Sequence, residues 1–250
     1  MSTISLLTVV LLALMVIVGG RQGWSAFWSL LLNFCCLFFA IVLVSWGLSP
    51  LWITLLAGIL ILAQTIWLGV SDGFIAKQAF WSSLIVFIVL FALVTFVEYV
   101  AKVPGFGVED TDALEGMSLS IGVSYPQIAV MVAALCSLGA IAEAAISVAA
   151  GMATLLDDGK LTAGQSLFHA GMQIGRQIIG TALNTLFFGF FGGFLALFIW
   201  FAGLGYSFLT VINDKVFVNE IIIVLVSFVG VLLTVPVTAW LVSGHQRPSQ

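Results

Sequence analysis

Long apolar runs separated by short polar segments dominate the chain. Each run is close to the roughly 20 residues that a helix needs to cross the hydrocarbon core of a bilayer. They cover residues 4–18, 27–45, 51–70, 80–100, 128–152, 174–204 and 218–242. The sixth run is too long for one crossing, and we expect it to begin as an amphipathic stretch. The pattern predicts an all-α integral membrane protein with a bundle of about seven transmembrane helices.

The polar connections indicate where helices begin and turn. Pro50 starts the third run, where its missing N–H costs nothing in a first helical turn. In segment 155–165, Asp158 and Gly159 predict a turn, and Thr162 and Gln165 are spaced as a capping box. A helix should therefore restart near residue 163, which would make runs five and six a tight helical hairpin. The longest connection, 101–125, is too short for a core of its own, so we expect one membrane domain over 1–250.

Composition supports a membrane location and excludes several functions. The chain is 62% hydrophobic and 7% charged, whereas a soluble domain has about 25% charged residues. A net charge of −4 argues against nucleic-acid binding. The three cysteines lie in apolar runs, and no Cys/His cluster has metal-ligand spacing. We therefore expect no disulfide framework, no metal site and no cofactor.

The basic residues predict an orientation in the membrane. With an outside N-terminus, five of them fall on or near the cytoplasmic side and two, Lys102 and Lys215, fall outside. The cytoplasmic set is Arg21, Lys77, Lys160, Arg176 and Arg247. The C-terminus would then be cytoplasmic, and the acidic segment 107–116 would be a solvated outside loop. No basic residue precedes the first run, so we expect a first span rather than a cleaved signal peptide.

One acid and one base lie inside the predicted hairpin. Glu143 lies about as far before the 158–159 turn as Arg176 lies after it, so both should sit about 20 Å from the turn. A charged side chain at the centre of a membrane helix costs about 3 kcal/mol on insertion scales. We therefore expect Glu143 and Arg176 to contact each other between helices five and six, directly or through one water.

Small and polar residues recur around this pair at three- and four-residue steps, which is typical of a shared helix face. On the fifth run they are Cys136, Gly139, Ala140, Glu143, Ser147 and Gly151. On the sixth they are His169, Gln173, Arg176, Gln177, Gly180 and Asn184. The face has two interpretations, a substrate or ion route and a purely structural ion pair between packed helices. The glycines would let the two helices approach closely.

Two further features have local interpretations. Glu98 lies at the end of the fourth run, four residues before Lys102, which favours an ion pair at the membrane interface. The glycine-rich stretch 189–193 fits a packing notch and a hinge equally well.

The hairpin also resembles a known family. LGAIAEAAISVAAGM (138–152) and LFHAGMQIGRQIIGTALNTLFFGFFGG (167–193) resemble the signature region of the YibE/F family of bacterial multipass membrane proteins. By that resemblance Glu143 stands at the acidic position. The residues that match as written are Ser147, Gly171, Gly175, Arg176, Gly180, Thr181, Asn184 and Thr185. Glu143 replaces the usual aspartate, and Gln177 stands where a second acid is expected, which argues against a metal or two-acid relay.

The resemblance adds Thr181 to the polar face, adds Gly171 and Gly175 to the packing glycines, and implies little about activity.

Members are often paired, and this chain resembles the shorter partner, so we expect a sister YibE/F-type protein or a homo-oligomer as partner. We expect a permease or permease subunit of the bacterial plasma membrane. A non-catalytic scaffold subunit is the alternative. An enzyme is disfavoured because there is no HExxH motif and His169 and His245 are the only histidines.

Overall fold

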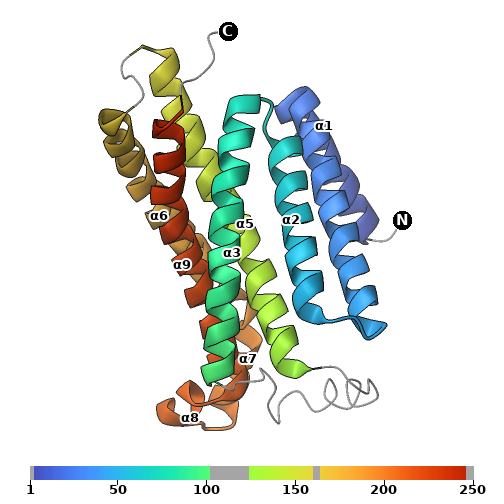
Figure 1. Cartoon of the computed structure of the whole chain (residues 1–250). Coiled ribbons are helices and arrows are strands. Elements are labelled where there is room, and N and C mark those ends of the chain that lie inside the picture. The colour runs from blue at the N-terminus through green and yellow to red at the C-terminus, as the bar shows by residue number, and fades with distance from the viewer. Residues whose placement is uncertain (1–2, 102–123, 160–163, 246–250) are drawn as a thin grey trace.

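A computed structural model describes residues 3–101, 124–159 and 164–245, and the part it describes contains helices and no strand. Figure 1 shows the arrangement. The helices are α1 (Thr3–Ser45), α2 (Pro50–Gly69), α3 (Gly73–Ala101), α5 (Tyr125–Asp157), α6 (Gln165–Gly193), α7 (Leu195–Gly203), α8 (Phe208–Ile212) and α9 (Lys215–Ser243).

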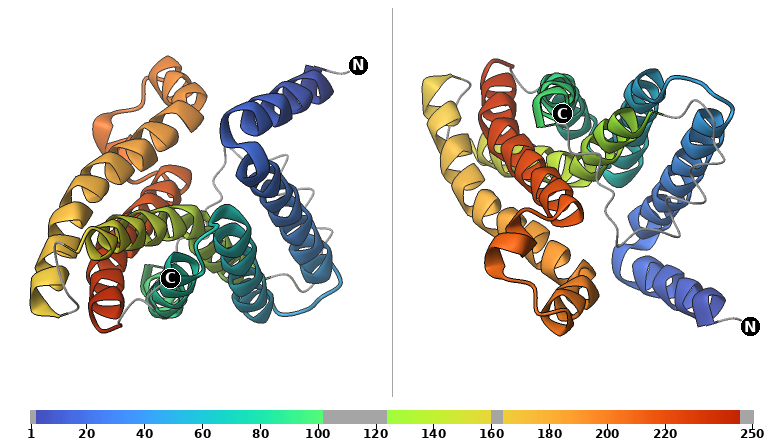
Figure 2. Two further views of the ribbon diagram at one scale, coloured as in Figure 1. Left: turned by 90° about the horizontal axis from the view of Figure 1, so that it is seen from above. Right: turned by 90° about the horizontal axis from the view of Figure 1, so that it is seen from below.

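Five of the described helices are long and apolar enough to cross a membrane: α1, α2, α3, α5 and α9. Helices α6 and α7 add a sixth if the bent pair is one span. The expected count of seven is not confirmed, because the first two apolar runs both lie in α1. Gly20, with φ 55° and ψ −130°, interrupts that helix, and Figure 2 shows its two pieces running in different directions. These helices make the chain a multi-pass membrane protein. The predicted placement of the N-terminus outside and the C-terminus in the cytoplasm stays a prediction.

Helix α5 occupies the middle of the bundle. It packs against α3, α9, α2 and α6, and both views in Figure 2 place it between α6 on one side and α1 on the other. Ala144, Ala145, Val148 and Ala149 of α5 are completely buried. Because these side chains are small, neighbouring helices can approach α5 closely from several directions.

Polar side chains join α1 to α2. The hydroxyls of Ser25 and Ser29 donate to backbone carbonyls of α2, at 2.8 Å and 3.0 Å. Gln22 also donates to a carbonyl of α2, at 2.6 Å. The side-chain amide of Asn33 donates to the hydroxyl of Thr65 at 2.8 Å. Spaced three and four residues apart, these donors share one face of α1 and hold it along the second half of α2.

The turn between α5 and α6 is confirmed at Asp158 and Gly159, where Gly159 has φ 64°. The capping box is wrong, because α6 begins at Gln165 with Gly164 as its N-cap, so Gln165 is not the third helical residue. Thr162 lies outside the described residues. So do four other features of the sequence interpretation: Lys102, segment 107–116, Lys160 and Arg247.

The stretch 189–193 ends in a bend. Helix α6 stops at Gly193, and α7 continues at 49° to it. Apart from their own local backbone and chain neighbours, no atom lies within 4 Å of where a Cβ would stand on Gly192 or Gly193, so these glycines are not a notch for another helix in the described structure. Phe190 and Phe198, on either side of the bend, have ring centroids 5.9 Å apart, and both lie about 6 Å from the ring of Phe217 in α9. The ring contacts hold α7 against the start of α9.

Candidate functional site

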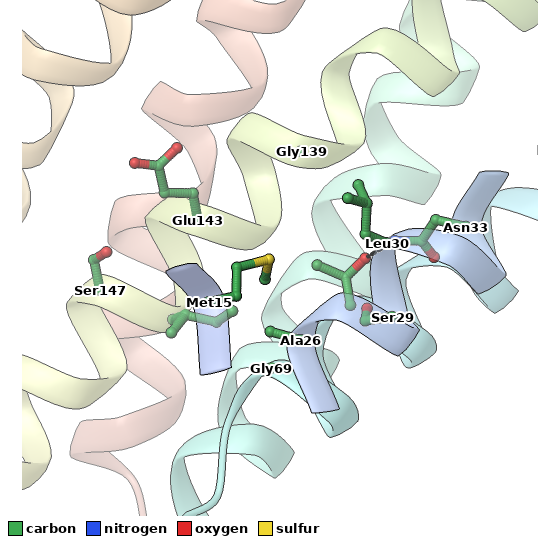
Figure 3. Close-up of a pocket in the computed structure, with 11 residues that line it drawn as sticks. Met15, Ala26, Ser29, Leu30, Asn33, Gly69, Gly139, Glu143 and Ser147 are labelled. Carbon is green, nitrogen blue, oxygen red and sulfur yellow. Dashed lines mark hydrogen bonds between the residues drawn. The ribbon is translucent and has the colours of Figure 1, made fainter. Parts of the chain in front are cut away.

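A pocket of about 440 Å³ lies between α1, α2 and α5. Figure 3 shows eleven of the residues around it. They are Met15, Ala26, Ser29, Leu30 and Asn33 from α1, Thr65 and Gly69 from α2, and Gly139, Glu143, Ile146 and Ser147 from α5. One wall therefore belongs to the helix that carries the predicted acid, and the other belongs to the N-terminal part of the chain.

The α5 wall is built from residues four apart. Gly139, Glu143 and Ser147 share one face of the helix, and the pocket extends over all three. The neighbours Ala142 and Ala144 face the protein core and are 2% and 0% exposed. Glu143 itself is exposed and is the one charged residue of the described pocket lining. The lining therefore contains a single carboxylate among otherwise apolar and weakly polar residues.

The opposite wall contains polar groups that the sequence interpretation missed. Ser29 donates to the carbonyl of Gln64, and Asn33 donates to Thr65. Ser29, Asn33 and Thr65 all line the pocket. Their signal in the sequence was the spacing of the polar residues at 22, 25, 29 and 33, which marks one face of a helix in an otherwise apolar run.

The structure does not bring Glu143 and Arg176 together. Arg176 is exposed on α6 and does not line the pocket, and no ion pair or hydrogen bond joins the two residues, both of which the structure describes. Helix α6 approaches α5 through Ile174, which packs against Gly151. Arg176 comes two residues later, about 200° further around the helix. Equal distance from the turn sets a similar depth for the two charges, but it does not set the direction in which each points.

The other predicted polar residues of α6 form a separate surface, here called the α6 polar face. All of its members are exposed: His169, Gln173, Arg176, Gln177, Gly180, Thr181 and Asn184. The opposite side of α6, with Leu167, Gly171, Gly175 and Ala182, is buried. The polar residues of α5 and α6 thus lie on different surfaces rather than on one shared face.

The predicted packing glycines divide into two groups. A Cβ built on Gly175 would overlap Val235 of α9, and one on Gly171 would overlap the sulfur of Met152 in α5. On Gly151 it would lie 3.1 Å from Ile174. Gly139 and Gly180 have no such neighbour within 4 Å. Helix contacts in the described structure therefore occur at the first three glycines, whereas Gly139 faces the pocket and Gly180 faces outward.

Glu98 does not lie at an exposed interface. It is 2% exposed, and neither of its carboxylate oxygens has a hydrogen-bond partner. The expected partner, Lys102, lies outside the described residues. Asn219 of α9 is also buried, and its side-chain oxygen has no partner either. Among the residues that the structure describes, no group of three or more His, Cys, Asp or Glu side chains could hold a metal ion.

Several apolar helices of spanning length, with α5 in the middle and a mostly apolar pocket beside it that contains one carboxylate, define a helical multi-pass membrane protein. Comparison with known protein families shows to which of them the chain belongs. The chain belongs to the YibE/F-like protein family, whose sequence model matches residues 7–246, nearly the whole chain. The resemblance of the hairpin to that family is thereby confirmed. No match was found among curated proteins or among solved structures.

Proposed function

We propose that this protein is a membrane permease or permease subunit, and that the Glu143 pocket is its substrate site. The observation that carries the proposal is a carboxylate without an ion-pair partner, presented to a pocket of about 440 Å³ between apolar helices. Pockets for small molecules have volumes of about 300–1,000 Å³. The substrate is therefore a small molecule or an ion.

The cost of keeping Glu143 supports a functional role. A charged side chain in the middle of a membrane helix costs about 3 kcal/mol on insertion scales. Arg176 does not offset that cost in the described structure, so the ion pair is not the reason for the carboxylate. Intramembrane ionisable residues that face a cavity mark substrate and ion pathways.

We also propose that another membrane protein chain covers the α6 polar face. An arginine and several amides exposed toward lipid are unfavourable, and a sister YibE/F-type protein or a second copy of this chain would supply partners for them. This face is what favours the scaffold alternative. A scaffold would not account for the pocket, however, so we place the permease first, in the bacterial plasma membrane and without an enzymatic role.

Cysteine cross-linking tests the covered face. A single cysteine replacing Gln173, on the α6 polar face, should give a disulfide- or maleimide-linked species larger than the monomer in native membranes. A cysteine replacing Leu56 of α2, whose side chain is exposed on the surface of the bundle, should give none. Mass spectrometry of the linked species identifies a second copy or a sister protein, and equal behaviour of the two variants would contradict a specific interface.

Uptake by reconstituted vesicles tests the permease. Purified protein in liposomes is incubated with a bacterial metabolite extract, and the compounds that accumulate inside are identified by mass spectrometry. We expect at least one compound to accumulate with the unmodified protein and with Glu220→Gln, a span carboxylate that does not line the pocket. It should be lost with Glu143→Gln. Identical contents in all three vesicle preparations, and in empty ones, would refute the proposal.

A further inference from the structure

We propose that the Glu143 pocket selects lipophilic organic cations. This inference rests on the proposed substrate site and adds the chemical class of its ligand. Three features of the pocket carry it: the sign of its charge, the scarcity of further polar ligands, and the apolar character of its remaining walls.

The sign of the charge follows from the described lining. Glu143 contributes a carboxylate, and neither lysine, arginine nor histidine lines the pocket. Arg176, the base that the sequence predicted as the partner of Glu143, is exposed on α6 and does not line the pocket. Arg21 of α1 does not line it either. Across the pocket, the donors of Ser29 and Asn33 are engaged with α2. A bound anion would therefore meet a negative charge without a compensating base, whereas a cation would meet its counter-ion.

The number of oxygen ligands argues against a bare calcium or magnesium ion. Calcium takes about six to eight oxygen ligands and magnesium requires a near-octahedral set. The pocket offers the Glu143 carboxylate and the hydroxyl of Ser147, while Ser29 and Thr65 are already bonded across the α1–α2 contact. The amide oxygen of Asn33 has no hydrogen-bond partner, but it is buried. A cation whose charge is spread over a large, weakly hydrated group loses less hydration on entering and needs fewer ligands.

The remaining walls supply the apolar contacts. Met15 and Leu30 of α1 and Ile146 and Gly139 of α5 line the pocket. Methionine is flexible and polarisable and adapts to irregular apolar shapes. If the exposed face of Glu143 lies in the hydrocarbon layer, as the proposed span of α5 requires, the attraction between the carboxylate and a cation is stronger there than at an aqueous surface. An apolar body with one delocalised positive charge matches this combination of walls.

Two probes with nearly the same shape and opposite charge test the proposal. Tetraphenylphosphonium is a cation and tetraphenylborate is its anionic counterpart. Binding of each to the full chain in lipid nanodiscs is measured by equilibrium dialysis, with empty nanodiscs subtracted to remove partition into lipid. Thermal melting of each variant establishes that it is folded.

The charge variant is Glu143→Gln, with Glu220→Gln as its matched control. We expect Glu143→Gln to weaken tetraphenylphosphonium binding about tenfold or more, because the cation loses its counter-ion. Glu220→Gln should leave binding unchanged. Tetraphenylborate should bind more weakly than the cation and show no dependence on Glu143. Equal affinity for the two probes, or cation binding insensitive to Glu143, would overturn the inference.

A second variant fills the pocket without changing its charge. Gly139→Leu projects into open space, because nothing lies within 4 Å of a Cβ at that position. It should also weaken tetraphenylphosphonium binding, whereas unaltered binding would place the probe elsewhere and contradict the proposal.

The two proposals fail in different ways. Glu143-dependent binding of the cation without uptake of any compound into vesicles would refute the permease and leave the site. Glu143-dependent uptake of an anionic compound would support the permease and refute the preference for cations.

Discussion

Replacing Gly175 with alanine tests the closest approach between α6 and α9. The added methyl group would overlap Val235, which is 0% exposed and has all three of its side-chain carbons near the new atom. Valine has one strongly preferred rotamer in a helix, so it cannot rotate away without strain. Overpacking of this kind costs about 1–3 kcal/mol of unfolding free energy.

Gly180→Ala is the matched control on the same helix. Alanine is favoured over glycine inside a helix by about 0.5–1 kcal/mol, and this gain is common to both positions. No atom lies within 4 Å of a Cβ on Gly180. The difference in unfolding free energy between the two variants therefore isolates the overlap with Val235, and we expect it to be about 1–3 kcal/mol in favour of Gly180→Ala.

The assay is unfolding of the detergent-solubilised protein by added SDS, followed by far-ultraviolet circular dichroism. Adding Val235→Ala to Gly175→Ala should recover part of the loss, because the methyl group then enters the space that valine leaves. A coupling free energy of about 1 kcal/mol between the two sites is expected for residues in contact. Equal midpoints for Gly175→Ala and Gly180→Ala, or additive effects of the two substitutions at 175 and 235, would refute the α6–α9 contact.

Three further predictions address the pocket walls, the charges and the orientation. Asn33→Val and Thr65→Val should each lower the unfolding free energy by about 1 kcal/mol. Because both remove the same hydrogen bond between Asn33 and Thr65, the loss in the double variant should be smaller than the sum of the two single losses. Glu143→Gln and Arg176→Gln should be additive in unfolding free energy to within about 0.5 kcal/mol; a coupling above about 1 kcal/mol would show that they meet. Asp158→Cys should resist an impermeant thiol reagent added outside intact cells, and rapid labelling would invert the predicted orientation.

Helices α2, α3, α5 and α9 were predictable from the sequence because their apolar runs have the length and hydropathy of a membrane span. Pro50 does begin α2, and Asp158 and Gly159 do form the turn after α5. The break at Gly20 was not predicted as a bend within one helix. Hydropathy records where the chain is apolar, whereas a single left-handed glycine between two apolar runs changes their direction without changing composition.

The site was predictable only in part. The spacing of Glu143 and Ser147 predicted one polar face of α5, and both residues do line a pocket. The prediction that this face of α5 meets the polar residues of α6 was not met. Helical spacing shows which residues share one face of a helix, and distance from the turn shows their depth in the membrane. Neither shows which neighbouring helix that face contacts. The contact of Ile174 with Gly151 turns Arg176 away from α5. The wall at Ser29 comes from a segment more than 100 residues distant, which only tertiary packing brings to Glu143.

Ligand protection of a cysteine at position 147 tests whether the pocket beside Glu143 is the substrate site of the protein. Ser147→Cys, on the pocket wall, and Asn184→Cys, on the exposed side of α6, are each made in a chain whose three native cysteines are replaced. The rate of N-ethylmaleimide modification is measured with and without tetraphenylphosphonium or tetraphenylborate. We expect tetraphenylphosphonium to slow modification at position 147 and to leave the rate at 184 unchanged, and we expect tetraphenylborate to slow neither. Unchanged rates at 147, or equal slowing at both positions, would contradict the proposed substrate site.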